Sequence, residues 1–296
     1  MVRHSESFDS HYKAIHGKLI LIGYEPDGDS VRFKADNEND FDDLYRHFKI
    51  KPCAHDRSVQ LRFEGADAVE LHYRGHRQVG GDDARDKLLE ILGFTDIEYA
   101  GGGLKVQSCN PSSIPAIILT QAADPFGRPI SYILIGQEER FEDNASVSVD
   151  NEILDKTVNM QMLKNGYAYP LLYTSTPRSH RDRIREIAKN AKDKKKGIWQ
   201  QDSSPSFDLI DFSSVDAPTG SVIYPKVYRR TVDYLTDLNR GFTGDLSEWI
   251  HSKGSKEDDE VILDERFQSR LSQVIEVHNS RIAMTADIMD MTFVER

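Results

Sequence analysis

Acidic side chains recur at short, defined spacings in the first quarter of the chain. Asp27 and Asp29 stand in the segment PDGDSV, where an Asp-Gly pair predicts a tight turn between two strands. Asp67 and Glu70 stand in GADAVE, directly after a strand-like segment. Because carboxylate oxygens suit a hard divalent cation, acids gathered at strand ends indicate a metal site.

Two arginines complete this set of charged residues. Arg62 lies inside the strand-like segment LRFEGAD, and Arg128 lies in DPFGRPISYI, just before another strand. A charge inside an apolar strand is costly unless it is paired or faces a ligand. A guanidinium group donates two parallel hydrogen bonds, which suits a phosphate. Taken singly, Asp29 also fits a structural hairpin turn, and Arg62 also fits a pair with a glutamate on the sheet.

The spacing of apolar residues indicates the elements that must position these side chains. Alternation typical of strands occurs over 17–34, 58–64, 114–121 and 129–136. Helical periodicity occurs over 81–94, 158–168 and 177–196. The third helix is basic, with nine lysines and arginines between residues 178 and 196, which suits either a solvated face or a phosphate backbone. Strands mixed with helices in this order predict an α+β unit.

The last third of the chain has a different character. Residues 203–220 are rich in serine, proline and aspartate and predict a linker, followed by helices over 225–239 and 245–253. From Leu263 to Phe293, apolar residues recur every three or four positions, which predicts one long terminal helix. This helix would either pack on its neighbours or pair with a second copy of the chain in a homodimer.

The ordered motifs resemble the staphylococcal-nuclease-like (thermonuclease) family. That family shows a DGD turn, an R-L-x-x-x-D-[AT]-P-E strand end, a D-x-x-G-R turn, an N-x-x-[ML]-[LV]-x-x-G-x-A helix and a closing Ile-Trp. This chain has DGDSVRF, LRFEGADAVE, DPFGRPISYI, NMQMLKNGYA and GIW in the same order, over about residues 17–201. The resemblance implies a five-stranded OB-fold barrel with three helices.

The resemblance also implies a metal site. Asp29 corresponds to the second aspartate of the family's DGD turn, and Asp67 corresponds to the aspartate of its strand end. Both are Ca²⁺ ligands in the family, together with the backbone carbonyl that corresponds to Ala68. The implied cofactor is therefore Ca²⁺.

Three further positions correspond to the family's catalytic residues. Glu70 matches the glutamate that positions or deprotonates the attacking water, and Arg62 and Arg128 match the arginines that hold the scissile phosphate. Cation and arginines together would neutralise the charge that grows on the phosphate. The implied function is a Ca²⁺-dependent endonuclease that hydrolyses DNA or RNA and leaves 3′-phosphate ends.

Two positions depart from the family pattern. Val69 stands where the family has a proline, which leaves Glu70 less firmly held, and Phe126 replaces a familiar tyrosine. Some relatives keep the fold without the catalytic residues and serve as binding modules. The alternative function is therefore a weak or inactive module that binds nucleic acid or another partner, although the complete residue set favours catalysis.

Composition limits the remaining possibilities. The chain has 296 residues, a net charge of −11 and a mean hydropathy of −0.56, and it lacks an apolar run long enough to span a membrane. Its two cysteines exclude a disulfide scaffold and a four-cysteine zinc site. The first residues lack the apolar segment of a secretory signal, so we expect a cytoplasmic protein.

These features predict two domains joined by a linker. Residues 1–202 are expected to form the catalytic domain, 203–220 the linker, and 221–296 a mainly helical domain for oligomerisation or regulation. Residues 203–296 carry 17 acidic and 10 basic residues, so this region is the more acidic one. A hypothesis from this charge is that the C-terminal domain inhibits the nuclease.

Overall fold

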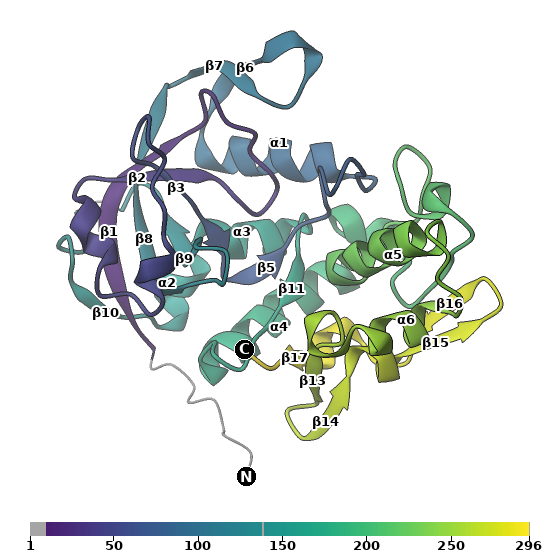
Figure 1. Ribbon diagram of the computed structural model, residues 1–296. Helices are drawn as coiled ribbons and strands as arrows, with labels where there is room; N and C mark the ends of the chain where they lie inside the picture. The colour runs from purple at the N-terminus through teal and green to yellow at the C-terminus, as the bar shows by residue number, and fades with distance from the viewer. Residues whose placement is uncertain (1–9, 138, 296) are drawn as a thin grey trace.

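The computed structural model describes residues 10–137 and 139–295. The N-terminal part (residues 10–202) is built around one mostly antiparallel sheet, seen at the left of Figure 1. The strand order is β3-β2-β1-β8-β9-β4, and β10 also pairs with β1. The strands are β1 (His11–Ile20), β2 (Arg32–Ala35), β3 (Val59–Gln60), β4 (Arg62–Phe63), β8 (Ser113–Ala123), β9 (Pro129–Leu134) and β10 (Ser146–Ser148).

The long strand β1 lies at the centre of this sheet and pairs with three neighbours. It contacts β10 at one end and β2 at the other, and β8 runs along most of its length. Gly17 lets β1 pass close over β2, because a Cβ there would lie 2.3 Å from the carbonyl oxygen of Lys34. Since β4 pairs in parallel with β9 at the far edge, the sheet curls into a nearly closed, barrel-like layer.

The predicted α+β class is confirmed, and the sheet differs in detail from the expected five-stranded barrel. It has seven strands, and the single strand expected over 58–64 is split into β3 and β4 of two residues each. The break falls at Leu61, whose amide donates to the Val31 carbonyl at 2.9 Å while the neighbouring residues change partner from β2 to β9.

The three helices predicted in the N-terminal part are confirmed. Gly93 and Gly166 end the first and second of them in the left-handed conformation, with φ of 88° and 75°. Two smaller strand pairs, β5 with β11 and β6 with β7, flank the main sheet. The elements are β5 (Gly65–Asp67), α1 (Gly81–Leu92), β6 (Thr95–Tyr99), β7 (Val106–Asn110), α2 (Asn151–Asp155), α3 (Val158–Asn165), β11 (Tyr169–Leu171) and α4 (Arg178–Asp193).

The C-terminal part (residues 203–295) is helical only in its first half. The helices predicted over 225–239 and 245–253 are confirmed as α5 (Pro225–Leu238) and α6 (Leu246–Ser252). Two three-stranded sheets accompany them, in the orders β12-β16-β15 and β14-β13-β17. Their strands are β12 (Ser206–Asp208), β13 (Glu260–Leu263), β14 (Phe267–Arg270), β15 (Ile275–His278), β16 (Arg281–Met284) and β17 (Met291–Phe293).

The long terminal helix expected from Leu263 to Phe293 is a wrong prediction. The segment folds into the hairpins β13–β14 and β15–β16 and the short strand β17. The turn residues explain the difference, because Asp264, Glu265 and Asn279 adopt positive φ, as tight hairpin turns require. The helix expected to pair in a homodimer is therefore not formed.

The two parts share one core. Buried apolar side chains of both belong to one continuous cluster. Strand β17 reaches across, since the Phe293 amide donates to the Leu172 carbonyl and the Phe293 carbonyl accepts from Thr174, both at 2.8 Å. The segment 203–220, expected as a linker, contains β12, which pairs with β16. The C-terminal part therefore packs directly on the N-terminal part.

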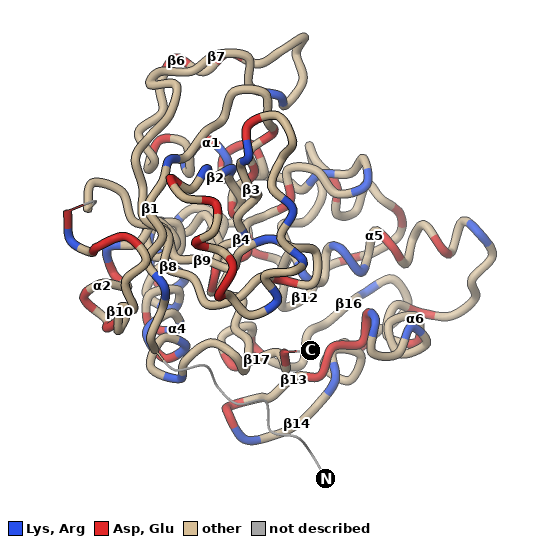
Figure 2. The backbone as a smooth tube through the Cα atoms, turned by 60° about the vertical axis from the view of Figure 1, so that its left-hand side comes forward, with Lys and Arg blue, Asp and Glu red and all other residues tan. Residues whose placement is uncertain are grey.

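The basic helix α4 contributes to this packing. Two of its arginines, Arg181 and Arg185, hold Glu265 of the C-terminal part at 2.8 and 2.6 Å, and Arg183 pairs with Asp155 at 2.6 Å. Figure 2 shows acidic and basic residues interspersed along both parts of the chain. Among the described residues, no helix is both long enough and apolar enough to cross a membrane.

Candidate active site

The turn that carries Asp29 lies against the segment that carries Asp67. Gly28 allows this approach, because a Cβ there would lie 2.7 Å from the Cβ of Ala68. The backbone carbonyl of Asp29 accepts from the amide of Phe63 at 3.2 Å, and its Oδ2 accepts from the amide of Ala68 at 3.2 Å. The DGD turn is thus fixed both to β4 and to the end of β5.

Arg62 on β4 connects the two aspartates. Its Nη1 donates to Asp29 Oδ2 at 2.7 Å, and its Nη2 donates to Asp67 Oδ1 at 2.6 Å. The Asp67 side chain is fully buried. Two carboxylates can lie this close inside the protein because the guanidinium group offsets their repulsion and satisfies their oxygens.

Glu70 follows β5, and its backbone is held by Gln78. The amide of Glu70 donates to Gln78 Oε1 at 2.9 Å, and the amide of Gln78 donates to the Glu70 carbonyl at 2.8 Å. Gln78 Nε2 in turn donates to the carbonyl of Ile223, just before α5, at 2.7 Å. Val69, at the position of the family's proline, is fully buried. Hydrogen bonds and packing therefore hold the loop that lacks the proline.

Arg229 on α5 joins the cluster, and reasoning from the sequence missed it. Its Nη2 donates to Asp67 Oδ2 at 2.9 Å and its Nη1 to Asp67 Oδ1 at 3.3 Å, while Nη1 also contacts Glu70 Oε1. A signal was present, because Arg229 and Arg230 directly follow the buried residues Val227 and Tyr228. Arginines beside apolar helix positions need buried partners.

Arg128 lies beside this cluster, in the turn between β8 and β9. Its amide and its Nε donate to Asp124 at 2.9 and 2.7 Å, and its positive charge opposes the rise in the pKa of Asp29. Because β9 pairs with β4, Arg128 precedes the strand next to Arg62. Phe126, in the same turn, is 85% exposed. The structure thus joins Asp29, Arg62, Asp67 and Glu70 by ion pairs and places Arg128 nearby.

Burial and the two arginines set the ionisation of the carboxyl groups. Burial would raise the pKa of Asp67, but Arg229 and Arg62 together outweigh it and hold that pKa well below its usual range. Burial raises the pKa of Glu70, and Arg229 opposes this rise. Burial likewise raises the pKa of Asp29, against the charge of Arg62. Asp67 is therefore the most firmly ionised member of the cluster.

The three residues expected to bind metal are neighbours. Asp29 and Asp67 meet at one guanidinium group, and the amide of Ala68 contacts Asp29. Carboxylate and carbonyl oxygens are hard donors that fit Ca²⁺ chemically. Within residues 10–137 and 139–295, no group of three or more His, Cys, Asp or Glu side chains is arranged to hold a metal ion. Fitting donors are thus present, with Arg62 bridging the two carboxylates.

A comparison with protein families agrees with the order of the motifs. Residues 114–201 match the family model described as staphylococcal nuclease homologue. This part of the chain is therefore similar to staphylococcal nuclease homologues. The matched residues include Arg128 and helices α3 and α4, whereas Asp29, Arg62, Asp67 and Glu70 precede them. A search of curated proteins finds no significant match to the chain.

Within the matched segment, Asn159 ties the site to the sheet. This buried residue lies in the first turn of α3, and its Nδ2 donates to the carbonyls of Glu64 and Ser131 at 3.0 and 2.9 Å. Its Oδ1 accepts from the amide of Ile133 at 3.1 Å. A single asparagine therefore joins the backbone between β4 and β5 to strand β9, which keeps Arg62 and Asp67 in register with the strand after Arg128.

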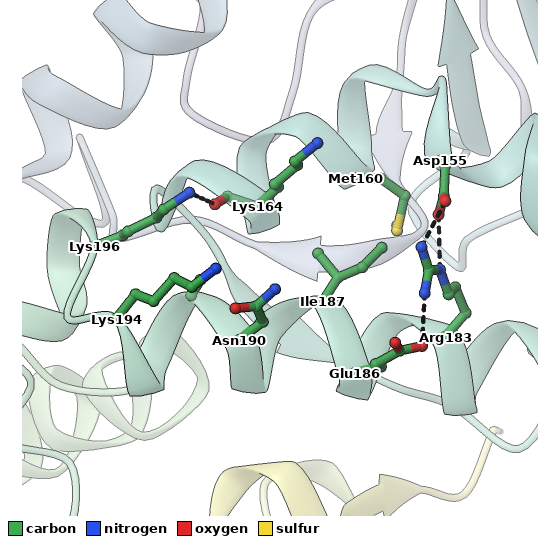
Figure 3. A pocket seen from close by; sticks show the side chains of 10 residues that line it. Asp155, Met160, Lys164, Arg183, Glu186, Ile187, Asn190, Lys194 and Lys196 are labelled. Carbon is green, nitrogen blue, oxygen red and sulfur yellow. Dashed lines mark hydrogen bonds and ion pairs between the residues drawn. The ribbon is translucent and has the colours of Figure 1, made fainter.

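A hollow between α3 and α4 lies apart from the carboxylate cluster. It encloses about 300 Å³, and no residue of the cluster lines it. Figure 3 shows Asn190 of α4, and Lys194 just after that helix, on the side of the gap opposite α3. The Lys164 side chain of α3 points away from them, and Lys196 Nζ donates to the Lys164 carbonyl at 3.1 Å. Its lining is mixed, because apolar Met160 and Ile187 stand beside charged side chains, and Arg183 within it is paired with Asp155.

Proposed function

We propose that this protein is a Ca²⁺-dependent endonuclease that hydrolyses phosphodiester bonds of DNA or RNA and leaves 3′-phosphate ends. The observation that carries the proposal is the contact cluster of Arg62 with Asp29, Asp67 and, through Arg229, Glu70. The motifs of the sequence alone predict four of these residues, Asp29, Arg62, Asp67 and Glu70. The staphylococcal nuclease homologue match at residues 114–201 supports the same class of reaction.

In the proposed reaction, a water oxygen attacks the phosphorus atom and the bond to the 5′ oxygen breaks. Glu70 accepts the proton of this water, and the leaving 5′ oxygen takes a proton from solvent. Arg62 and Arg128 donate hydrogen bonds to the non-bridging phosphate oxygens, where negative charge grows. Arg62 must release Asp29 or Asp67 to do so, because its two terminal nitrogens are bonded to those carboxylates.

Asp29, Asp67 and the Ala68 carbonyl are the groups that would hold the cation. Bound there, Ca²⁺ would supply positive charge that attracts the substrate phosphate and offsets its developing charge. The low pKa of Asp67 keeps one of these ligands ionised over a wide pH range. The carbonyl and the side chain of Asp29 accept from the amides of Phe63 and Ala68, and these bonds set the spacing between the turn and the end of β5.

The test is hydrolysis of end-labelled single- and double-stranded DNA and RNA with Ca²⁺ or with EDTA. Glu70→Gln should lower kcat by about 10²–10⁴-fold through loss of the base, and Arg62→Ala by about 10²–10³-fold. Glu98→Gln and Arg77→Ala change exposed residues of the same types and serve as matched controls. Products that accept a 3′ label only after phosphatase treatment would identify 3′-phosphate ends.

Each outcome bears on a separate part of the proposal. Cleavage that persists in EDTA would refute the role of Ca²⁺, and cleavage by Glu70→Gln at the wild-type rate would refute the role of Glu70. A wild-type protein that binds these strands and cuts none of them would be the inactive binding module, and the nuclease proposal would fail.

A further inference from the structure

Arg229 contacts both acidic residues at the end of β5, although it is 162 residues from Asp67 in the chain. Its guanidinium group forms a fork, with Nη1 and Nη2 on the two oxygens of Asp67, and Nη1 also on Glu70 Oε1. The Arg229 side chain is only 18% exposed. This residue comes from the C-terminal part, outside the segment matched by the nuclease family.

The contact with both Asp67 and Glu70 requires an arginine, and a lysine could not replace it. A planar guanidinium with several fixed donors can serve two carboxylates at once, whereas an ammonium group is a single point charge. Among the described residues, Arg229 forms the ion pair with Glu70. Without it, Glu70 would be a buried carboxylate whose charge is not offset by direct contact, and its side chain would lose its orientation.

Helix α5 is a fixed support for Arg229. Tyr224 and Tyr228 of this region are fully buried, and the Tyr73 hydroxyl donates to Asp233 on α5 at 2.9 Å. The carbonyl of Ile223 accepts from Gln78, the residue that holds the Glu70 amide. The same short stretch therefore holds both the backbone and the side chain of Glu70.

This double support stands where the family pattern is broken. The family's proline before the glutamate is Val69 here, so the loop has no ring to restrict its backbone. Gln78 supplies hydrogen bonds to the Glu70 backbone, and Arg229 supplies an ion pair to its carboxylate. Both connect to the C-terminal part. The structure thus replaces a local restraint by a long-range one.

We propose that Arg229 is a positioning residue for the cleavage reaction, so that the C-terminal part completes the active site. This role of Arg229 rests on the proposed nuclease function. Arg229 holds Glu70 by Oε1, and the described residues place no hydrogen-bond donor on Oε2, which leaves that oxygen to accept the proton of water. When Arg62 turns to the substrate phosphate, Arg229 keeps Asp67 paired through Oδ2.

The experiment compares Arg229→Ala with Arg230→Ala in the full chain. Arg230 is the adjacent residue on α5 and makes an equivalent buried pair, with Asp259 at 2.7 Å, away from the cluster. Arg229→Ala should lower kcat by about 10²-fold, as expected for a misplaced reacting group, with KM nearly unchanged. Millimolar guanidinium should restore part of this activity, and Arg230→Ala should keep wild-type kcat. Hydrogen exchange over residues 67–73 should quicken in Arg229→Ala alone.

The alternative outcomes are distinct. Equal or higher kcat in Arg229→Ala would overturn the proposal, because Arg229 would then be dispensable or would restrain the site. Equal losses in both variants, with no rescue by guanidinium, would also overturn it in favour of general stability. If Arg229→Ala does not fold, Arg229→Lys takes its place, and wild-type kcat in that variant would refute the need for a fork. Failure of the wild type to cleave any strand would instead refute the nuclease function itself.

Discussion

Glu64 is a buried carboxyl group next to the site that takes no part in the proposed chemistry. Its Oε1 accepts from the Tyr12 hydroxyl at 3.0 Å, and the residue is 9% exposed. Burial raises its pKa from 4.5 to about 7, against the hydrogen bonds of Tyr12 and Thr176. Near pH 6 the folded protein therefore keeps a proton on Glu64 that the unfolded chain has released.

The sign of the pH dependence follows from this difference. Where the folded state binds more protons than the unfolded chain, stability falls as pH rises. For Glu64 the window runs from 4.5 to about 7, the unfolded and folded pKa values. At about 1.4 kcal/mol for each unit of pKa, this carboxyl group should cost the folded state about 3 kcal/mol by the end of the window.

The perturbation is Glu64→Gln, which keeps an acceptor for Tyr12 and cannot ionise. The free energy of unfolding of this variant, minus that of the wild type, should rise by about 3 kcal/mol between pH 4.5 and 7.5 and stay level above. Urea unfolding at a series of pH values measures it, and Glu25→Gln, at an exposed glutamate, serves as the matched control. A constant difference across the window would refute a protonated, buried Glu64 and the environment assigned to it.

Three other substitutions test the local structure. Gly28→Ala places a methyl group 2.7 Å from the Cβ of Ala68 and should lower the free energy of unfolding by about 1–3 kcal/mol in urea titrations, together with the cleavage rate. Asn159→Leu removes the partner of the Ile133 amide and of the Glu64 carbonyl, while the Ser131 carbonyl still accepts from the Glu64 amide, so it should cost about 2 kcal/mol or more in the same measurement; a smaller loss would mean that water replaces the amide. Burial would raise the pKa of Glu265, but hydrogen bonds from Arg181, Arg185 and Thr292 outweigh it and lower that pKa to about 2. The stability that this carboxylate contributes is therefore present above pH 4.5 and is lost toward pH 2. Glu265→Gln should therefore be less stable than the wild type at pH 7, with the gap closing at low pH, and a gap independent of pH would refute the ion pairs as its cause.

Local signals in the sequence predicted most of the N-terminal part. The Asp-Gly turn, the glycines that end α1 and α3, and alternating strands such as β8 and β9 are all set by residues close together in the chain. Of the predicted site residues, Asp29 and Asp67 meet at Arg62, whereas Glu70 joins them only through Arg229 and Arg128 lies beside the others. Motif spacing could do this because each motif occupies a single turn or strand end.

The wrong predictions for the C-terminal part have one physical origin. Short-range patterns in the sequence do not determine which distant segments pair with one another. Apolar residues at intervals of three and four from Leu263 fit a helix, but the same intervals arise when short strands and turns alternate. Asp264 and Glu265, which adopt positive φ in the turn, are the residues that indicate a hairpin here, although the apolar spacing favours a helix. The expected linker similarly contains β12, whose partner β16 lies more than seventy residues later.

Arg229 illustrates the same limit at the site itself. No spacing within the chain links it to Asp67 and Glu70, because α5 reaches them only after the C-terminal part has packed on the shared core. The negative charge of the C-terminal part suggests an inhibitor of the nuclease. The residue of this part that contacts the cluster, however, is the cation Arg229. Removing that part would therefore leave Glu70 without its ion-pair partner and Gln78 without the Ile223 carbonyl. We therefore expect a chain that ends before residue 203 to lose cleavage activity. If the C-terminal part were an inhibitor, the same truncation would raise that activity.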